Sequence, residues 1–132
     1  MSPIDWAILP FKRFGDFSGR SPRAEYWWFV LLVLISEIIA MVVDAVIGTG
    51  QMAGPYGLVV GIFVLAVIIP HIAVGIRRLH DTDHSGWWLL MFLLPIIGPI
   101  VLLVFFCTEG DQGPNRFGED PYGSDTLEEV FA

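Results

Sequence analysis

Six ionisable side chains that could carry chemistry fall within residues 77–84, which hold two arginines, two histidines and two aspartates. His80 and His84 are four residues apart, a spacing that places two imidazoles on one face of a helix, where they could hold Zn²⁺ together with a carboxylate. The residues from Asp83 to Gly86, however, are typical of a turn, and a turn would break this spacing. We therefore expect hydrogen-bonded turn chemistry here and no metal site.

A second group of charges lies before the first long apolar run. We expect ion pairs between the two groups, which would clamp the start of the first helix to the end of the second: Arg20, Arg23 and Glu25 on one side, and Arg77, Arg78 and Asp81 on the other. A single exposed pair contributes about 0–1 kcal/mol, but several linked pairs in a partly dry interface can fix geometry. The alternative is a headgroup or phosphate site built from the four arginines.

Other catalytic and binding signatures are missing from the sequence. No nucleophile stands beside a base, no paired carboxylates suggest a hydrolase, and the glycines near residue 110 are typical of turns and form no nucleotide fingerprint. The net charge is −7, and half of the fourteen acidic residues follow Cys107, so the sequence offers no basic face for nucleic acid. We expect no enzymatic activity, no cofactor and no nucleic-acid partner.

Three apolar runs must position these charges. They cover residues 26–47, 57–76 and 87–107, each about 20 residues long, and a helix of that length crosses a hydrocarbon core of about 30 Å. The chain is 55% hydrophobic and 16% charged. We therefore predict an all-α integral membrane protein with three hydrophobic helical segments and the lipid bilayer as a partner. Residues 1–122 would form one membrane domain, and residues 123–132 an acidic tail that we expect to be disordered.

The third run contains Pro95, Gly98 and Pro99 at its centre. One such residue would kink a helix, but three together could divide it into two short halves. The run then either spans the membrane or turns back as a re-entrant hairpin, which is the slightly favoured alternative. Ser85 or Asp83 can cap this segment, and Trp87 and Trp88 can anchor it at the interface, because indole rings favour headgroup depth.

The segment before the first run mixes apolar and charged residues. Its apolar members recur between Ile4 and Phe17, which predicts an interfacial amphipathic segment lying on the membrane and interrupted at Pro10. The alternative is an irregular arm that packs on the helices. At the start of the first run, Ser21 can cap the helix, with Pro22 at its first position.

Basic residues are unevenly distributed among the connections. The N-terminal arm and residues 77–85 carry arginines, whereas residues 48–56 carry no charge. Because cytoplasmic loops of membrane proteins are enriched in basic residues, we expect the N-terminus and residues 77–85 in the cytoplasm and residues 48–56 outside. The acidic tail would return to the cytoplasm if the third run is a hairpin and lie outside if it spans.

Two acids and one histidine lie inside the apolar runs. Glu37 falls near the middle of the first run, Asp44 lies on the same face nearer its end, and His71 belongs to the second run. Charges in lipid are costly, so intramembrane acids are functional candidates by default. We expect Glu37 to make a helix-packing hydrogen bond. The alternative is a small oligomeric transporter or channel that uses Glu37 and Asp44, with His71 as a relay.

Three separated motifs resemble one protein family. They are FSGRSPRAEYW at residues 17–27, RRLHDT with SGWW at residues 77–88, and GPNRFGEDP at residues 113–121, which contains Asn115, Asp120 and Pro121. In this order, and over roughly residues 11–122, they resemble the bacterial inner-membrane family catalogued as domain of unknown function 805. The resemblance implies a small integral protein of the bacterial inner membrane and carries no assigned activity.

Three helical segments shield few polar groups from lipid on their own. We therefore expect a homo-oligomer or a subunit of a larger membrane complex. The leading interpretation is a structural or accessory protein that binds other membrane proteins or lipids, and that presents its arginines and residues 115–121 on one side of the membrane.

Overall fold

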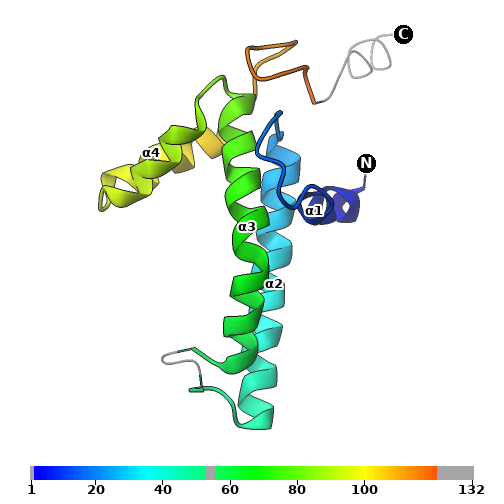
Figure 1. Ribbon diagram of the computed structural model, residues 1–132, viewed down its shortest axis with the longest axis vertical. Coiled ribbons are helices and arrows are strands. Elements are labelled where there is room, and N and C mark those ends of the chain that lie inside the picture. Colours follow the sequence, from blue (N-terminus) through cyan, green and yellow to red (C-terminus); the bar gives the residue numbers. More distant parts are fainter. Residues whose placement is uncertain (1, 53–55, 122–132) are drawn as a thin grey trace.

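The computed structural model describes residues 2–52 and 56–121. α2 and α3 run antiparallel side by side, while α1 and the unit formed by η1 and α4 project to opposite sides near one end of this pair (Figure 1). No strand occurs in the described ranges, so the predicted all-α class is confirmed. The elements in chain order are α1 (Pro3–Lys12), α2 (Arg23–Ile47), α3 (Leu58–Asp81), the 3₁₀ helix η1 (Gly86–Leu93) and α4 (Ile97–Cys107).

α2 and α3 are long and apolar enough to cross a membrane. With 25 and 24 residues they extend about 37 and 36 Å, at 1.5 Å per residue. Many of their outward-facing aliphatic side chains are exposed, Val46 to 79% and Leu65 to 73%. Continuous apolar surface of this kind calls for an apolar environment, which lipid chains supply. α4 is apolar as well but has only 11 residues.

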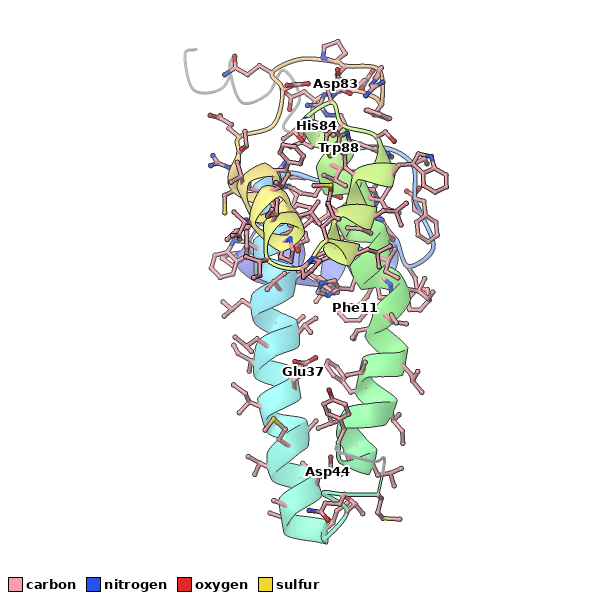
Figure 2. The ribbon with its side chains drawn as sticks, turned by 90° about the vertical axis from the view of Figure 1, so that its left-hand side faces the viewer. Phe11, Glu37, Asp44, Asp83, His84 and Trp88 are labelled. Carbon is pink, nitrogen blue, oxygen red and sulfur yellow. The ribbon has the colours of Figure 1, made fainter. Side chains whose placement is uncertain are left out.

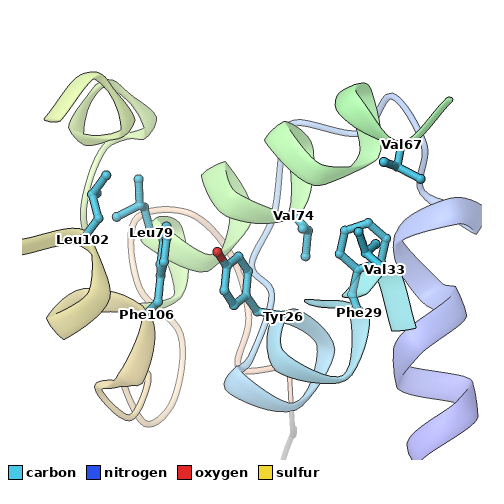
Figure 3. Close-up of a cluster of buried hydrophobic side chains, with 8 residues drawn as sticks. All are labelled: Tyr26, Phe29, Val33, Val67, Val74, Leu79, Leu102 and Phe106. Carbon is cyan, nitrogen blue, oxygen red and sulfur yellow. The ribbon is translucent and has the colours of Figure 1, made fainter. Parts of the chain in front are cut away.

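The hydrophobic core lies at the end of the α2–α3 pair from which α1 and α4 project. There the rings of Tyr26 and Phe106 lie 4.5 Å apart and join α2 to α4. Toward the other end the core stops, and the buried residues of α2 beyond Val33 are Ala40 and Asp44. The eight buried side chains of the core come from α2, α3 and α4 (Figure 3): Tyr26, Phe29, Val33, Val67, Val74, Leu79, Leu102 and Phe106.

α1 begins at a capping box, in which Ser2 Oγ accepts a hydrogen bond from the Asp5 N–H and Asp5 Oδ2 accepts one from the Ser2 N–H. The helix continues through Pro10, so the predicted interruption there is wrong. Pro10 lies in the last turn, where its missing N–H costs a single helical bond. α1 packs across α2, with the Phe11 ring 5.4 Å from the Phe29 ring. The N-terminal segment is thus helical and not an irregular arm.

Residues 86–107 fold as two short elements that lie against each other, so the structure forms the hairpin and not a single long helix. The chain reverses at residues 94–97 in a γ-turn, in which the Ile97 N–H donates to the Pro95 carbonyl oxygen at 2.8 Å and Ile96 adopts a φ of +69°, unusual for a β-branched residue. Gly98 permits the close contact after this reversal, because a Cβ on it would lie 1.5 Å from the Met91 carbonyl oxygen.

The start of α2 and the chain after α4 were not fully predicted from the sequence. α2 begins at Arg23 with no side-chain cap, and the predicted cap by Ser21 is wrong because Ser21 Oγ accepts a hydrogen bond from Arg77 Nε instead. After α4 the chain returns to the end of α3, where the N–H at residue 111 donates to the Asp81 carbonyl oxygen at 2.8 Å. The predicted disordered tail, residues 123–132, lies outside the described residues.

Candidate functional site

Two consecutive arginines near the end of α3 organise the most buried charges of the described chain. Arg77 and Arg78 are buried, and so are the side chains of Arg20, Glu25 and Asp81. We call these five residues the arginine cluster. Because neighbouring residues on a helix point about 100° apart, Arg77 reaches the segment before α2 whereas Arg78 reaches α4.

Arg77 ties α3 to the segment between α1 and α2. Its Nε donates to Ser21 Oγ at 2.8 Å, its Nη2 donates to Glu25 Oε1 at 3.0 Å, and its Nη1 donates to the main-chain oxygens of Asp16 and Arg13. The Ser21 N–H in turn donates to the Arg77 carbonyl oxygen at 2.9 Å. The planar fork of a guanidinium group allows one side chain to hold all these points at once.

Glu25 is a fully buried acid between two cations. Its Oε1 pairs with Arg77, and its Oε2 lies 3.8 Å from Arg13 Nη1. No described residue donates a hydrogen bond to Oε2. Moving a charge out of water costs several kcal/mol, so this carboxylate depends on the two cations for compensation.

Asp81 is shared by the other two arginines of the cluster. Arg20 Nε donates to Oδ1 and Arg78 Nη1 donates to Oδ2, each at 3.0 Å. Gly110 lies directly against this carboxylate, because a Cβ on Gly110 would be 1.9 Å from Asp81 Oδ2. Asp81 therefore positions both arginines and fixes the path of the chain after α4.

Donors from α2 and α3 converge on the last carbonyl groups of α4. Arg78 Nε and Trp27 Nε1 both donate to the Phe106 oxygen, at 3.2 and 3.0 Å, and Arg23 Nη1 donates to the Cys107 oxygen at 3.2 Å. These carbonyl groups have no partner inside the helix, and cations are favourable at the negative end of a helix dipole. The hairpin is thus attached to the helix pair through its main chain.

Arg20 binds the segment after α4 in the same way. It donates to the carbonyl oxygens of Asp111 and Gly113, at 2.5 and 2.6 Å. Asp120 Oδ2 accepts from the Gly113 N–H at 3.0 Å and closes this loop on itself. Pro121 is the last described residue and is half-buried.

The three sequence motifs meet at His80. Its ring stacks on the Phe117 ring, with centroids 4.1 Å apart, and its Nδ1 lies 2.9 Å from the Gly19 carbonyl oxygen. Asn115 Nδ2 donates to the His80 carbonyl oxygen at 2.9 Å. His80 is therefore held on both sides by main-chain and aromatic contacts that bring the motifs together.

His84 lies apart from His80 and belongs to the base of the hairpin. Its ring stacks on Phe105 with centroids 4.2 Å apart, and its Nδ1 lies 2.8 Å from Thr82 Oγ1. Ser85 caps η1 by accepting from the N–H of Trp87 at 3.2 Å, and the Trp87 side chain is exposed. Among the described residues, no three His, Cys, Asp or Glu side chains are grouped so that they could hold a metal ion.

Two further ion pairs lie outside the arginine cluster. Arg13 pairs with Asp16 at 3.1 Å, and Arg116 pairs with Asp83 at 3.2 Å. The hydroxyl and main-chain N–H of Ser18 donate to the Asp16 carboxylate and lower its pKa, and Arg13 adds to this effect. Arg116 and Asp83 are solvated, so their pair contributes little to stability, whereas the Arg13 side chain is half-buried.

The hydrogen bonding of the cluster favours a structural clamp over a phosphate site. Each of the three buried guanidinium groups donates to at least three protein acceptors. A phosphate would therefore have to displace existing hydrogen bonds to reach any of these arginines.

Asp44 is engaged at the other end of the helix pair. This buried carboxylate accepts from Thr49 Oγ1 at 2.5 Å and from the N–H groups of Val59 and Val60 at 2.9 and 3.0 Å. Both valines belong to the first turn of α3, where N–H groups lack intrahelical partners, so Asp44 caps α3 from the neighbouring helix. Gly57 leaves room for it, since a Cβ there would lie 1.9 Å from Asp44 Oδ2.

Glu37 lies about halfway along α2 and points toward α3, as Asp44 does (Figure 2). It lines a groove of about 1040 Å³ together with Gly57 and Gly61, and a second groove of about 340 Å³ together with His71. No described residue donates a hydrogen bond to the Glu37 carboxylate, so the expected helix-packing bond is not made within the described chain.

The sequence did not predict that Ser21 accepts a hydrogen bond from Arg77, that Gly110 lies against Asp81, or which main-chain oxygens the arginines bind. The sequence around Gly110 is typical of an ordinary turn. Every residue has a carbonyl group, so the sequence does not indicate which of them an arginine binds. The capping role of Asp44 did have a signal, because a carboxylate near the C-terminal end of its own helix opposes that helix dipole and needs a partner elsewhere.

The fold and the arginine cluster define a small α-helical membrane protein, in which two helices of spanning length are fastened at one end by buried ion pairs. The chain belongs to the family described as "Protein of unknown function (DUF805)", which matches residues 14–119 and confirms the predicted family. Inner membrane protein YhaH of Escherichia coli (strain K12) is 43% identical over 118 residues, covering 89% of this chain and 97% of that protein. Inner membrane protein YhaI of the same strain is 46% identical over 122 residues, covering 92% and 99%. No solved structure shows significant similarity to the chain.

Proposed function

We propose that the protein is a structural or accessory component of the bacterial inner membrane that binds a helix of another membrane protein. The observation that carries this proposal is the position of Glu37, which faces a groove near the middle of α2 and receives no hydrogen bond from the described chain. A polar group at that depth is costly unless it finds a partner. A donor side chain on a second helix would supply that partner.

The shape of the larger groove supports a helix as the ligand. Gly57 and Gly61 line it on the α3 side and Ala45 on the α2 side. Small residues allow helix backbones to approach closely, and interhelical hydrogen bonds strengthen such contacts in lipid. Met41 and Leu65 also line this groove and make part of its wall apolar.

The proposal includes an orientation in the membrane. The N-terminal segment, residues 77–85 and residues 108–121 would lie on the cytoplasmic face, and the η1–α4 hairpin would enter the membrane from that side. The distribution of charge supports this, because the arginines gather at that end and residues 48–52 carry none. A reporter fused after residue 132 should be active only in the cytoplasm, and periplasmic activity would contradict the orientation.

The partner is tested by gentle purification from the native membrane, followed by measurement of the particle mass and identification of co-purifying proteins. We expect a stoichiometric complex with a foreign membrane protein, lost in Glu37→Leu and retained in Ile38→Ala. Ile38 is the matched control because it is the next residue on α2 and is 53% exposed. A protein that purifies alone, or a complex that survives Glu37→Leu, would contradict the proposal.

A second candidate function is a small oligomeric transporter or channel. It is favoured by one observation, namely that Glu37 and His71 line the same groove. Asp44, the other acid of this candidate, is engaged as a cap. Loss of proton flux into liposomes in Glu37→Gln, with flux retained in Ile38→Ala, would establish this candidate in place of the first.

A further inference from the structure

Two elements enlarge only one end of the molecule. α1 and the η1–α4 hairpin both project from the end of the α2–α3 pair that carries the arginine cluster, and they do so on opposite sides (Figures 1 and 2). At the other end the described chain consists of α2, α3 and the residues that connect them. The cross-section of the protein therefore differs between its two halves.

The hairpin has the dimensions and the surface of an element embedded in one leaflet. Residues 86–107 include no charged side chain, and Leu93 and Ile96, near the tip, are 79% and 77% exposed. α4 has 11 residues and a length of about 16 Å, close to half of a hydrocarbon core of about 30 Å. The hairpin therefore enters one leaflet and returns without reaching the other.

α1 lies in the same half of the membrane. Its Phe11 ring contacts the Phe29 ring. Phe29 lies four residues after Glu25 on α2, which is about one helical turn, or about 6 Å, below the arginine cluster along the helix axis. Amphipathic helices at membrane surfaces lie about 5–10 Å into the boundary between headgroups and acyl chains. On the outward side of α1, Ile4 is 72% exposed. Lipid of a single leaflet thus covers the free faces of both α1 and the hairpin.

We propose that the protein is a membrane wedge that prefers bilayers in which the leaflet around the arginine cluster is convex. That leaflet accommodates α1, the hairpin and two spanning helices, whereas the opposite leaflet accommodates only the two helices. The excess area is relieved when the wider half lies on the outside of a bend, which is why helices inserted into one leaflet respond to curvature. This preference requires neither a partner at Glu37 nor a particular orientation in the cell, so its failure would leave the proposed function untouched.

The test uses pure full-length protein in giant vesicles from which a narrow membrane tube is pulled outward. The chain has one cysteine, so a single thiol reporter is obtained by combining Cys107→Ser with Glu119→Cys, at an exposed position on the cluster side. A fluorescent maleimide that cannot cross the membrane labels only molecules whose cluster faces outward. We expect these molecules to be enriched in the tube relative to the flat membrane.

The mirror reporter combines Cys107→Ser with Gln51→Cys, an exposed position at the opposite end of the helix pair. It labels only molecules whose cluster faces the vesicle interior, and these should be depleted from the tube. Opposite signs for the two reporters support the wedge. Equal densities in tube and flat membrane, or a shift of the same sign for both reporters, would overturn it.

Paired glutamine substitutions identify the element responsible. Leu93→Gln with Ile97→Gln should draw the tip of the hairpin toward the headgroups and reduce the enrichment of the outward-facing reporter at least twofold. The control is Val46→Gln with Ile47→Gln, at residues of similar exposure at the other end: 79% and 66% against 79% and 59%. The control should retain the sorting, and an unchanged enrichment in the hairpin variant would exclude the hairpin as a source of the wedge.

Discussion

The two ends of the α2–α3 pair bury charge in different ways. At one end, Arg20 and Arg78 converge on Asp81, and Arg77 pairs with Glu25, so cations and acids compensate one another. At the other end, the Asp44 carboxylate is stabilised by a hydroxyl and by two amide groups of α3. No basic side chain pairs with Asp44 among the described residues.

The two ends of one helix pair are thus held by two kinds of contact, and we expect their removal to lower the stability by different amounts. Ion pairs in a dry site are costly to break, because removing one partner leaves the other charge buried and uncompensated. A carboxylate at a helix start contributes less, but it needs no countercharge, since the amide groups and the helix dipole serve that role. The arginine end therefore fixes the arrangement of several elements, whereas the Asp44 end closes one connection.

The largest expected effect comes from breaking one pair of the cluster. Arg77→Ala leaves Glu25 buried with only the more distant Arg13, and we expect a loss of about 3–5 kcal/mol in the free energy of unfolding. Denaturant unfolding in detergent measures this loss. The double variant Arg77→Met with Glu25→Gln removes both charges and should be more stable than the single one.

The exposed Arg116 supplies the matched control for this prediction. Arg116→Ala removes an ion pair to Asp83 in which both side chains are solvated, so stability should change by only about 0–1 kcal/mol. If Arg77→Ala were as mild as Arg116→Ala, the cluster would not be the clamp described above.

An intermediate effect is expected at the other end of the pair. Asp44→Ala removes the cap of α3 and should cost about 1–2 kcal/mol, with faster hydrogen exchange at the amides of Val59 and Val60. Asp44→Asn keeps one acceptor oxygen and should lose less. A cost as large as that of Arg77→Ala would remove the distinction between the two ends.

The smallest expected loss of stability comes from substituting one glycine at each end of the helix pair. Gly110→Ala would place a Cβ 1.9 Å from Asp81 Oδ2. Because two arginines hold Asp81, the loop should move instead, costing about 1 kcal/mol, the low end for overpacking, and increasing proteolysis after the exposed Arg116.

Gly57→Ala is the matched change at the other end, where a Cβ would also lie 1.9 Å from an aspartate oxygen, Asp44 Oδ2. Here we expect the carboxylate to be displaced, so Gly57→Ala should add little to the loss measured in Asp44→Ala. Full additivity of the two substitutions would show that the cap tolerates the methyl group.

The sequence identified the charged side chains of the cluster but not how most of their bonds are made. Opposite charges flanking two apolar runs are brought together by any antiparallel helix pair, so ion pairs between the two groups were expected, but the individual pairs, Arg77–Glu25 and Arg20–Asp81, come from the structure. Their other acceptors are carbonyl oxygens, which every residue possesses, and only the folded path of the chain selects among them. Ser21 was assigned to a cap for the same reason, since nothing local indicates a guanidinium arriving from α3.

The apolar segments show a similar division. Composition and length were sufficient for α2 and α3, whereas Pro95, Gly98 and Pro99 indicated a break without giving the direction of the chain after it. Glu37 and Asp44 lie on one helix face, as expected, yet only Asp44 is near enough to the start of α3 to reach its free amide groups. Glu37 and Asp44 have different surroundings because they lie opposite different parts of α3, and the sequence does not show how α2 and α3 are aligned.

The reliance of the arginines on main-chain acceptors has a consequence for biosynthesis. Arg78 donates to an oxygen 28 residues later in the chain, and Arg20 to oxygens 91 and 93 residues later. When the ribosome has finished α3, Asp81 is present for both arginines, but these main-chain acceptors have not been translated. Arg77 can therefore join α3 to α2 as soon as α3 is made, whereas the hairpin and the segment after it are attached only when they have been synthesised. A chain that ends before that point would keep the ion pairs to Asp81 but lack the carbonyl groups that complete the hydrogen bonding of Arg20 and Arg78.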